Sequence, residues 1–433
     1  MRDRPDMSAP RKNHRVKREA QASTSSRKIL FLLPFAPDVR GIHGGTRATG
    51  AMIDMLSQHH RVCVLYLTGP GDPAPRQLPK CERLMAIPKE SPSTRSGGAI
   101  ERIAAAATRI VARDPAWVRE CWSSEMAAAA ASVTADFKPD VVHFEFHVMA
   151  QYIPAVRSAR PKATLIVTEH EPGISADSGR GNLTLRQRLG GLARRRAWRR
   201  YERQVLPLAD GIIVFTRSDA SALEELLGDA APPIEVIPLR LPSDVAPSAG
   251  HAPVENDFVF VGNFRHPPNA DAARRLIGSI FPMIQRTLSG ATLAIVGTDP
   301  PQDVIEAASD EIKVTGWVDD PSIYLAGASV VLVPLRQGGG MRVKMLEACA
   351  AGTAIIASQM AVEGLSLRHG EEVIIAETNE QFAAAGIALM ADSKARDRLK
   401  RSSRRWWEDE HDSGRWSDEY ANLYSSLGRS KAR

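Results

Sequence analysis

The segment Gln337–Glu347 carries the residue types of an anion-binding site. It follows Val330–Val333, an apolar run typical of a buried strand. Three glycines, residues 338–340, let backbone N–H groups come close to a ligand. Arg342 and Lys344 then stand in the first turn of a predicted helix, where positive charge opposes the helix dipole. A bound anion would compensate this placement, and a diphosphate fits it best.

Glu347 is the carboxylate of this segment. If the helix begins near Val343, Glu347 lies about 60° around the axis from Lys344, so the two side chains share a face. A carboxylate is a good bidentate acceptor for two neighbouring sugar hydroxyls, and we expect Glu347 to take that role. Arg342 reaches the same ligand only from the loop before the helix. The alternative is a glycine-rich loop followed by an ordinary Lys344–Glu347 surface pair.

Three other loops place candidate residues where a predicted strand ends. His170 can exchange a proton with a substrate near neutral pH, and a structural histidine is the alternative. Gly44 and Gly45 form either a ligand-binding loop or a simple turn. Gly262 allows close backbone approach, and Arg265 beside it can face phosphates, although this loop also suits a helix cap. Two further candidates for reaching a cleft are Glu145 and His147.

The basic residues of the chain are concentrated in two segments. Residues 1–28 hold nine Lys or Arg and three acids, which accounts for the whole net charge of +6. We therefore expect residues 1–27 to be a disordered basic tail. Arg186–Arg203 holds eight arginines against one acid, with apolar residues between them. This basic amphipathic helix can lie on an anionic membrane surface or form a solvated helix face, and nucleic acid is not expected because no recognition module accompanies it.

Short apolar runs alternate with helical patterns, which is typical of doubly wound α/β layers. Strands are predicted at 28–33, 62–67, 141–144, 165–168 and 212–215, and then at 258–261, 293–296, 312–314, 330–333, 354–357 and 373–375. We predict an α/β fold with two Rossmann-like domains facing a cleft, because ligands of such sheets bind beyond the carboxyl ends of the strands. The predicted parts are the tail 1–27, an N-terminal domain 28–240, a linker 241–256, a C-terminal domain 257–410, and a helix at 411–433 that packs back on the body.

With these residues in place, the chain resembles family 4 glycosyltransferases, which have the two-Rossmann GT-B fold. The resemblance spans about Lys28 to Leu427. It is strongest in V-G-N-F-x-H-P-P-N-x-D-A from Val261, V-T-G-W-V-D-D from Val314 and G-G-G-x-R-x-K-x-L-E from Gly338. It implies that the second domain binds a nucleotide-diphospho-sugar and that the first binds a glycan or lipid-linked acceptor.

The resemblance also implies roles for single residues. The position of Glu347 holds ribose hydroxyls, and His170, in a T-x-H motif, lies by the donor sugar. Two positions depart from the pattern: the first carboxylate of E-x7-E is replaced by Gly339, and Asn269 stands where many members carry a lysine. Arg342 and Lys344 are plausible substitutes for the missing cation, as in a G-G-G-x-R-x-K branch. The predicted donor-binding residues are Gly44, Gly45, Gly262, Arg265, Gly339, Gly340, Arg342 and Lys344.

We therefore expect a glycosyltransferase of polysaccharide or cell-envelope glycoconjugate synthesis, acting with retention, with His170 and Glu347 as catalytic residues. A nucleotide-sugar epimerase of the same fold and a non-catalytic nucleotide-sugar-binding protein are the alternatives. No metal or other cofactor is expected, because no D-x-D motif or ligand cluster lies beside the phosphate loop. Scattered cysteines and the lack of a long apolar run favour the cytoplasm, and Arg186–Arg203 leaves peripheral attachment to the inner face of the membrane open.

Overall fold

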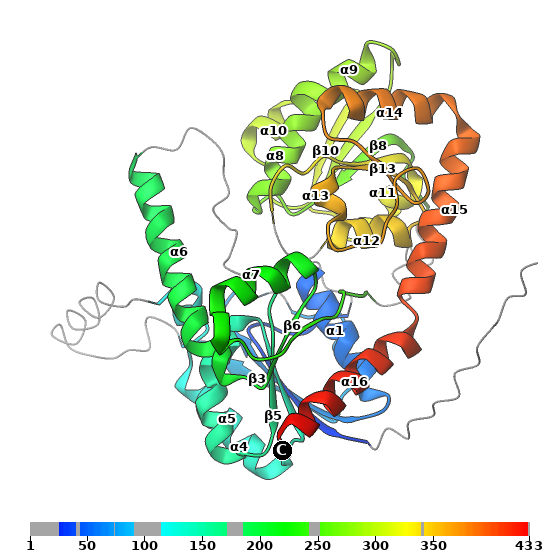
Figure 1. Ribbon diagram of the computed structural model, residues 1–433. Helices are drawn as coiled ribbons and strands as arrows, with labels where there is room; N and C mark the ends of the chain where they lie inside the picture. The colour runs from blue at the N-terminus through cyan, green and yellow to red at the C-terminus, as the bar shows by residue number, and fades with distance from the viewer. Residues whose placement is uncertain are drawn as a thin grey trace, which may run out of the picture.

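The structure is a computed structural model, and it describes residues 26–39, 44–72, 74–90, 114–170, 185–241, 252–338 and 342–431. Two α/β layers lie one above the other, and the C-terminal helix returns from the upper layer to the lower one (Figure 1). Residues 1–25 of the predicted tail and 242–251 of the predicted linker lie outside the described residues.

The N-terminal domain holds a seven-stranded sheet. Its elements are β1 (Lys28–Leu33), α1 (Gly44–Ser57), β2 (Arg61–Thr68), β3 (Arg83–Pro88), α3 (Ala116–Glu120), α4 (Ser124–Phe137), β4 (Val141–Glu145), η1 (His147–Tyr152), α5 (Ile153–Ala159), β5 (Thr164–Thr168), α6 (Leu185–Val205), η2 (Leu206–Leu208), β6 (Gly211–Val214), α7 (Arg217–Leu227), η3 (Gly228–Ala230) and β7 (Ile234–Val236).

The C-terminal domain holds a six-stranded sheet. Its elements are β8 (Asn256–Val261), α8 (Pro267–Arg275), the π-helical turn η4 (Leu276–Ile280), α9 (Phe281–Gln285), β9 (Leu293–Val296), α10 (Gln302–Glu306), β10 (Ile312–Gly316), α11 (Ser322–Gly327), β11 (Ala328–Val333), α12 (Val343–Ala350), β12 (Ala354–Ala357), α13 (Gln359–Val362), β13 (Ile374–Ile375), α14 (Asn379–Ala391) and α15 (Ser393–Glu410). The last helix, α16 (Ser413–Lys431), follows them.

The described strands of both sheets pair in parallel. Their orders are β3-β2-β1-β4-β5-β6-β7 and β10-β9-β8-β11-β12-β13, with Phe31 opposite His143 and Val330 opposite Phe258. The chain order reverses between β1 and β4 in one sheet and between β8 and β11 in the other. In doubly wound sheets the loops diverge at such points and leave a crevice for a ligand. The predicted α/β fold with two Rossmann-like domains is therefore confirmed.

Successive residues of β1 point to opposite faces of the N-terminal sheet, as the pleat of a strand requires. Leu30 and Leu32 pack into a core formed with α4, α5, α6 and α7. Ile29 and Phe31 pack into a second core, which α1 and α16 complete. Every side chain of β1 beyond Lys28 is buried, and this explains its continuous apolar run.

The helix α16 supplies part of the N-terminal core although it follows the C-terminal domain in the sequence. It packs directly on Gly211 in β6, where a Cβ atom would lie 2.7 Å from Leu427 Cδ1, so any other residue there would push the leucine side chain aside. Tyr424 Oη lies 2.8 Å from Nε2 of the buried His143. The buried stripe of the helix consists of Trp416, Tyr420, Leu423, Tyr424 and Leu427.

Arg240 fixes the place where the chain returns to the N-terminal domain. Its guanidinium donates to both carboxylate oxygens of Glu419 in α16, at 2.5 and 2.9 Å. Its Nε donates to the backbone carbonyl of Glu410, at the end of α15, at 2.6 Å. Because Arg240 is only 1% exposed, it joins the end of one domain to α16 in a region of low water content.

We expect Arg240→Met to lower the free energy of unfolding by about 2–4 kcal/mol, because it leaves Glu419 without its buried partner. Arg415→Met is the matched control: Arg415 also contacts Glu419, at 3.4 Å, but its side chain is 54% exposed, so a loss of about 0.5 kcal/mol or less is expected. Denaturant unfolding and hydrogen exchange of α16 measure both. Equal losses in the two variants would contradict the role assigned to Arg240.

Candidate active site

Two helices from different domains begin at the same place. The helix α1 starts at Gly44 and α12 starts at Val343. A Cβ atom on Gly44 would lie 2.6 Å from Cγ2 of Val343, so only glycine permits this approach. Figure 1 shows α1 beneath α12 at the contact between the layers. The positive ends of two helix dipoles therefore meet between the domains, which favours an anion there.

Three cations surround these helix starts. Arg342, the N-cap residue of α12, donates to Glu363 Oε2 at 2.8 Å. Lys344 Nζ donates to the side-chain oxygen of Asn269 at 2.5 Å and lies 5.8 Å from the centre of the Phe260 ring. The third cation is Arg47 in the first turn of α1, whose Nη1 lies 2.5 Å from Glu347 Oε1. The structure thus pairs Glu347 with Arg47 and not with Lys344.

The pKa values of two basic groups at the site are lowered by burial and by neighbouring positive charge. Desolvation lowers the pKa of Lys344 to about 8; the charge of Arg342 adds to this effect and Glu347 opposes it. Burial also lowers the pKa of His266, and the charges of Lys344 and Arg342 lower it further. Both pKa shifts have the same two causes: burial removes water from the charged form of the side chain, and neighbouring positive charges repel it.

Gly262 leaves room for Asn269, the residue that positions Lys344. A Cβ on Gly262 would lie 3.1 Å from Cγ of Asn269, so the glycine lets that amide pack against the end of β8. The amide donates to the Asn263 carbonyl at 2.8 Å and accepts from Lys344 through its oxygen. Arg265 is directed elsewhere: its side chain is 78% exposed and its Nε lies 3.0 Å from Asp299 Oδ2.

His170 lies at the carboxyl end of the N-terminal sheet, in contact with a buried carboxylate. Its Nε2 is 3.2 Å from Glu145 Oε2, and Thr168 Oγ1 donates to the other oxygen of Glu145 at 2.7 Å. Burial alone would raise the pKa of Glu145, but hydrogen bonds and charges of His143 and His170 outweigh it and lower that pKa to about 2. Glu145 is therefore ionised at neutral pH and orients the imidazole, whose ring stacks on Phe146.

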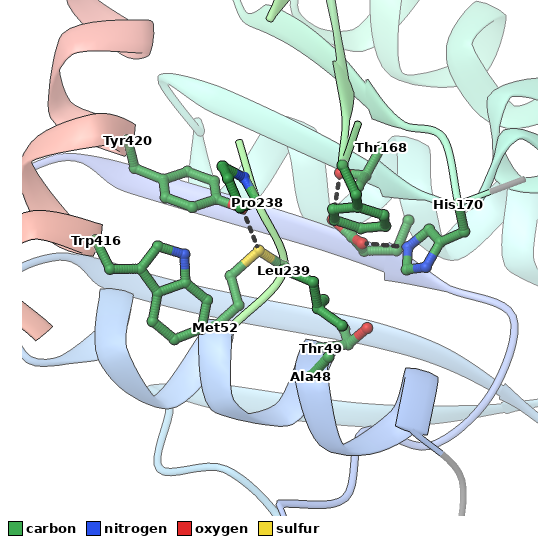
Figure 2. Close-up of a pocket in the computed structure, with 11 residues that line it drawn as sticks. Ala48, Thr49, Met52, Thr168, His170, Pro238, Leu239, Trp416 and Tyr420 are labelled. Atoms are coloured by element: carbon green, nitrogen blue, oxygen red, sulfur yellow. Dashed lines mark hydrogen bonds and ion pairs between the residues drawn. The ribbon is translucent and has the colours of Figure 1, made fainter. Parts of the chain in front are cut away.

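A pocket beside His170 joins this network to α1 and α16 (Figure 2). It is narrow: its side chains leave room for about one water molecule, and it is partly open to solvent. Tyr420 Oη and Met52 Sδ lie 2.9 Å apart on one side of it. In Figure 2 His170 and Thr168 face Tyr420 and Trp416 across the pocket, with Met52 below. The lining residues are Ala48, Thr49, Met52, Glu145, Thr168, His170, Phe215, Pro238, Leu239, Trp416 and Tyr420.

A second buried polar cluster lies in the N-terminal domain, and one of its residues, Glu169, directly precedes His170. His147 Nδ1 is 2.6 Å from Glu169 Oε1, and Glu202 of α6 offers a carboxylate oxygen within 4.8 Å of both. These residue types can bind a divalent cation, and within the described residues this is the group whose spacing would allow it. The Tyr201 hydroxyl donates to the His147 carbonyl at 3.1 Å, so the cluster belongs to the packing of α6 on η1 and not to the loop before α12.

The predicted site residues fall into several groups in the structure. His170 lines the pocket on the N-terminal side, and Gly45 lies in the first turn of α1. Gly339 and Gly340 lie outside the described residues. Four predicted residues come together where the two helices begin: Gly44, Arg342, Lys344 and Glu347.

Sequence reasoning missed Arg47. The signal that could have found it is the one that revealed Arg342 and Lys344, because Arg47 is also a cation in the first turn of a helix after a glycine pair. Its contact with Glu347 spans 300 positions of the sequence. No local pattern predicts such a pair.

Two glycosyltransferase family models match the chain. The glycosyl transferase 4-like domain matches residues 43–240, and the glycosyl transferases group 1 model matches residues 255–392. An exopolysaccharide phosphotransferase of Streptomyces coelicolor is 26% identical over 195 residues. That match covers 43% of this chain and 20% of the relative, so the chain spans about a fifth of the length of that curated relative.

Solved structures share the whole architecture. Sucrose-phosphate synthase from Thermosynechococcus elongatus superimposes with a TM-score of 0.64 at 16% identity, covering 93% of this chain and 100% of the other. HepE of Anabaena, solved with UDP and glucose, gives 0.63 at 12% identity, covering 92% and 100%. A TarM variant of S. aureus, solved with UDP and other ligands, gives 0.60 at 10% identity, covering 92% and 99%.

The order of the matched models agrees with the two domains of the structure, and the shared architecture is that of the GT-B fold. The chain has a glycosyl transferase 4-like N-terminal domain and a glycosyl transferases group 1 C-terminal domain, arranged in the GT-B fold.

Proposed function

We propose that the chain is a family 4 glycosyltransferase that moves a sugar, with retention, from a nucleotide-diphospho-sugar to a glycan or lipid-linked acceptor in polysaccharide or cell-envelope synthesis. The observation that carries this proposal is the meeting of two helix starts with Arg342, Lys344 and Glu347 between the domains. A diphosphate supplies the negative charge that this place lacks. The same set of residues offers a carboxylate for the ribose hydroxyls.

The proposed mechanism is electrostatic. Arg342, Lys344 and the helix N–H groups stabilise the charge that grows on the departing diphosphate. We propose no metal ion for this step, because Arg342 and Lys344 supply the positive charge beside the diphosphate. Closing the two domains on donor and acceptor would align them and exclude water, which limits hydrolysis of the donor.

His170 is proposed to contact the donor sugar. Its Nε2 faces the ionised Glu145, and this contact favours the tautomer with the proton on Nε2. Nδ1 then remains to accept from a sugar hydroxyl, and it has no hydrogen-bond partner among the described residues. Ala48 and Thr49, which form one wall of the pocket, lie four and five residues after the start of α1 at Gly44, a rise of roughly 6–7.5 Å along the helix. A sugar attached to a diphosphate at the helix starts would reach it.

A thermal-shift screen of UDP-, GDP- and ADP-sugars tests the donor, and UDP-sugars come first because HepE and TarM were solved with UDP. At about 100 times Kd, a bound donor should add roughly 2.7 kcal/mol of stability. Glu347→Gln should weaken binding at least tenfold while the protein stays folded. A matched control is Glu408→Gln, an exposed carboxylate of α15. No shift with any donor would refute the proposal, and isomerisation of the donor without acceptor would favour an epimerase.

The pKa of Lys344 gives donor binding a pH dependence. Free protein loses the Lys344 proton above pH 8, whereas a bound diphosphate holds that proton, so binding takes up a proton in this range. We expect the Kd of the nucleoside diphosphate to rise up to tenfold per pH unit above pH 8. In Lys344→Arg the cation stays charged, and the curve should be flat to pH 10. Calorimetry at several pH values decides this, and a flat wild-type curve would contradict it.

We also propose that α6 attaches the protein to the inner face of an anionic membrane. Leu192, Arg196, Arg199 and Arg203 recur along one side of α6 and are exposed, whereas Trp198 on the opposite side is buried. Leu192 is 52% exposed. Figure 1 shows α6 along the outer edge of the lower layer. None of the helices in the described part of the chain is long and apolar enough to cross a membrane, so attachment would be peripheral.

Charge reversal on α6 tests the attachment. Arg196→Glu with Arg199→Glu should abolish co-sedimentation with vesicles that contain anionic phospholipid, because it reverses the sign of the exposed stripe. Arg398→Glu with Arg401→Glu, on exposed positions of α15, is the control and should leave sedimentation unchanged. The role of α6 would be refuted if both double variants bound anionic vesicles equally, or if the wild-type protein bound neutral vesicles as well as anionic ones.

A further inference from the structure

Arg47 occupies the carboxylate that the proposed function gives to the donor ribose. Its Nη1 lies 2.5 Å from Glu347 Oε1, with the two side chains only 13% and 14% exposed. Arg47 belongs to the N-terminal domain and Glu347 to the C-terminal domain, so the ion pair crosses between the layers. In this structure, therefore, a ribose cannot bind Glu347 through both carboxylate oxygens unless the arginine moves.

The released guanidinium would need another anion nearby. The first turn of α1, which the structure describes in full, contains no acidic residue. Glu363 is held by Arg342 at 2.8 Å. Asp38, whose backbone N–H donates to the Thr46 carbonyl, has its carboxylate engaged by the backbone N–H groups of Arg76 and Gln77 at 2.8 and 3.0 Å. The start of α12 lies against Gly44, and Lys344 follows it with a pKa already lowered by desolvation and by Arg342. A displaced Arg47 would be stable here only beside an anion that arrives with the ligand.

We propose that Arg47 is a donor-binding residue that leaves Glu347 when the nucleotide binds and then contacts the donor diphosphate from the N-terminal domain. This inference rests on the proposed function. A guanidinium presents paired N–H donors that match phosphate oxygens. The diphosphate would then be held by Arg342 and Lys344 from one domain and by Arg47 from the other. Donor binding and the contact between the domains become one event.

The exchange makes a prediction of opposite signs for two ligands. A nucleoside carries the ribose without phosphates, so it competes with Arg47 for Glu347 and gains nothing from the released cation. A nucleoside diphosphate competes in the same way and also gains the new contact. Removing Arg47 should therefore tighten nucleoside binding and weaken nucleoside diphosphate binding. A residue that only supports the fold would change both affinities in the same direction.

The experiment measures Kd for uridine and UDP, guanosine and GDP, and adenosine and ADP, with wild type, Arg47→Met and Arg47→Lys. With the pair that binds wild type, we expect Arg47→Met to lower the nucleoside Kd about threefold to tenfold and to raise the diphosphate Kd at least tenfold. Arg47→Lys should retain part of the diphosphate affinity, because a point charge replaces the fork. Arg83→Met, which removes an exposed ion pair of the same domain, should change neither Kd.

Other outcomes overturn the inference. If Arg47→Met leaves diphosphate affinity unchanged or raises it, Arg47 does not contact the phosphates. If nucleoside affinity does not improve, the ion pair does not compete with the ribose. Should Arg47→Met fail to fold, Arg47→Lys decides alone: diphosphate affinity equal to or above that of wild type refutes the contact. The proposed function fails separately, when wild type binds none of the nucleoside diphosphates or when Glu347→Gln leaves nucleoside affinity intact.

Discussion

The close contact of Gly44 with Val343 is the constraint on which the site depends. It brings together two positive helix ends, and the chain adds Arg47, Arg342 and Lys344 to them. Gathering like charges in this way is unfavourable without a counter-charge, and burial together with the charge of Arg342 lowers the pKa of Lys344. The protein tolerates it by giving each cation a substitute partner: Glu347, Glu363 and the oxygen of Asn269. On the proposed function, an incoming diphosphate replaces these partners with a stronger one, so the cost of assembling the site becomes part of the preference for that ligand.

The topology of the two sheets brings Gly44 and Val343 together. The helices α1 and α12 each follow a strand beside a point where the order of a sheet reverses, so both begin at the carboxyl edge of their sheets. What holds the two edges together is the return of the chain to the N-terminal domain. Arg240 joins the end of α15 to Glu419, and α16 is buried against the N-terminal sheet. Because Trp416 and Tyr420 of that helix also line the His170 pocket, the same element stabilises the domain pair and shapes the site.

Sequence patterns predicted the fold wherever burial was continuous. They missed β3 and β7, whose residues are mostly exposed or half-buried at the edges of the N-terminal sheet, so no continuous apolar run marks them. Arg342 and Lys344 stood out in the sequence because the helix dipole is a local rule, and Glu347 stood out because it shares a helix face with Lys344. The partner of Glu347 could not be predicted, since Arg47 lies 300 positions away. Likewise, only the fold brings Glu202 to His147 and Glu169. Arg265 was predicted to face phosphates from its position after a strand, but in the folded chain its side chain forms an ion pair with Asp299.

On the proposed function, the site divides recognition between two places. The diphosphate would be bound by the helix starts and the cations, and the ribose by Glu347. All nucleotide-diphospho-sugars contain both groups, so these contacts give affinity but little selectivity. Selectivity for the sugar must then come from the His170 pocket, where polar groups lie on one side and Met52, Trp416 and Tyr420 lie on the other. An unpaired buried polar group penalises a wrong sugar more strongly than a lost apolar contact does. The Glu145–His170 contact is therefore the part of the pocket best able to discriminate between hydroxyl configurations, whereas the α16 wall sets the shape that a sugar must fit.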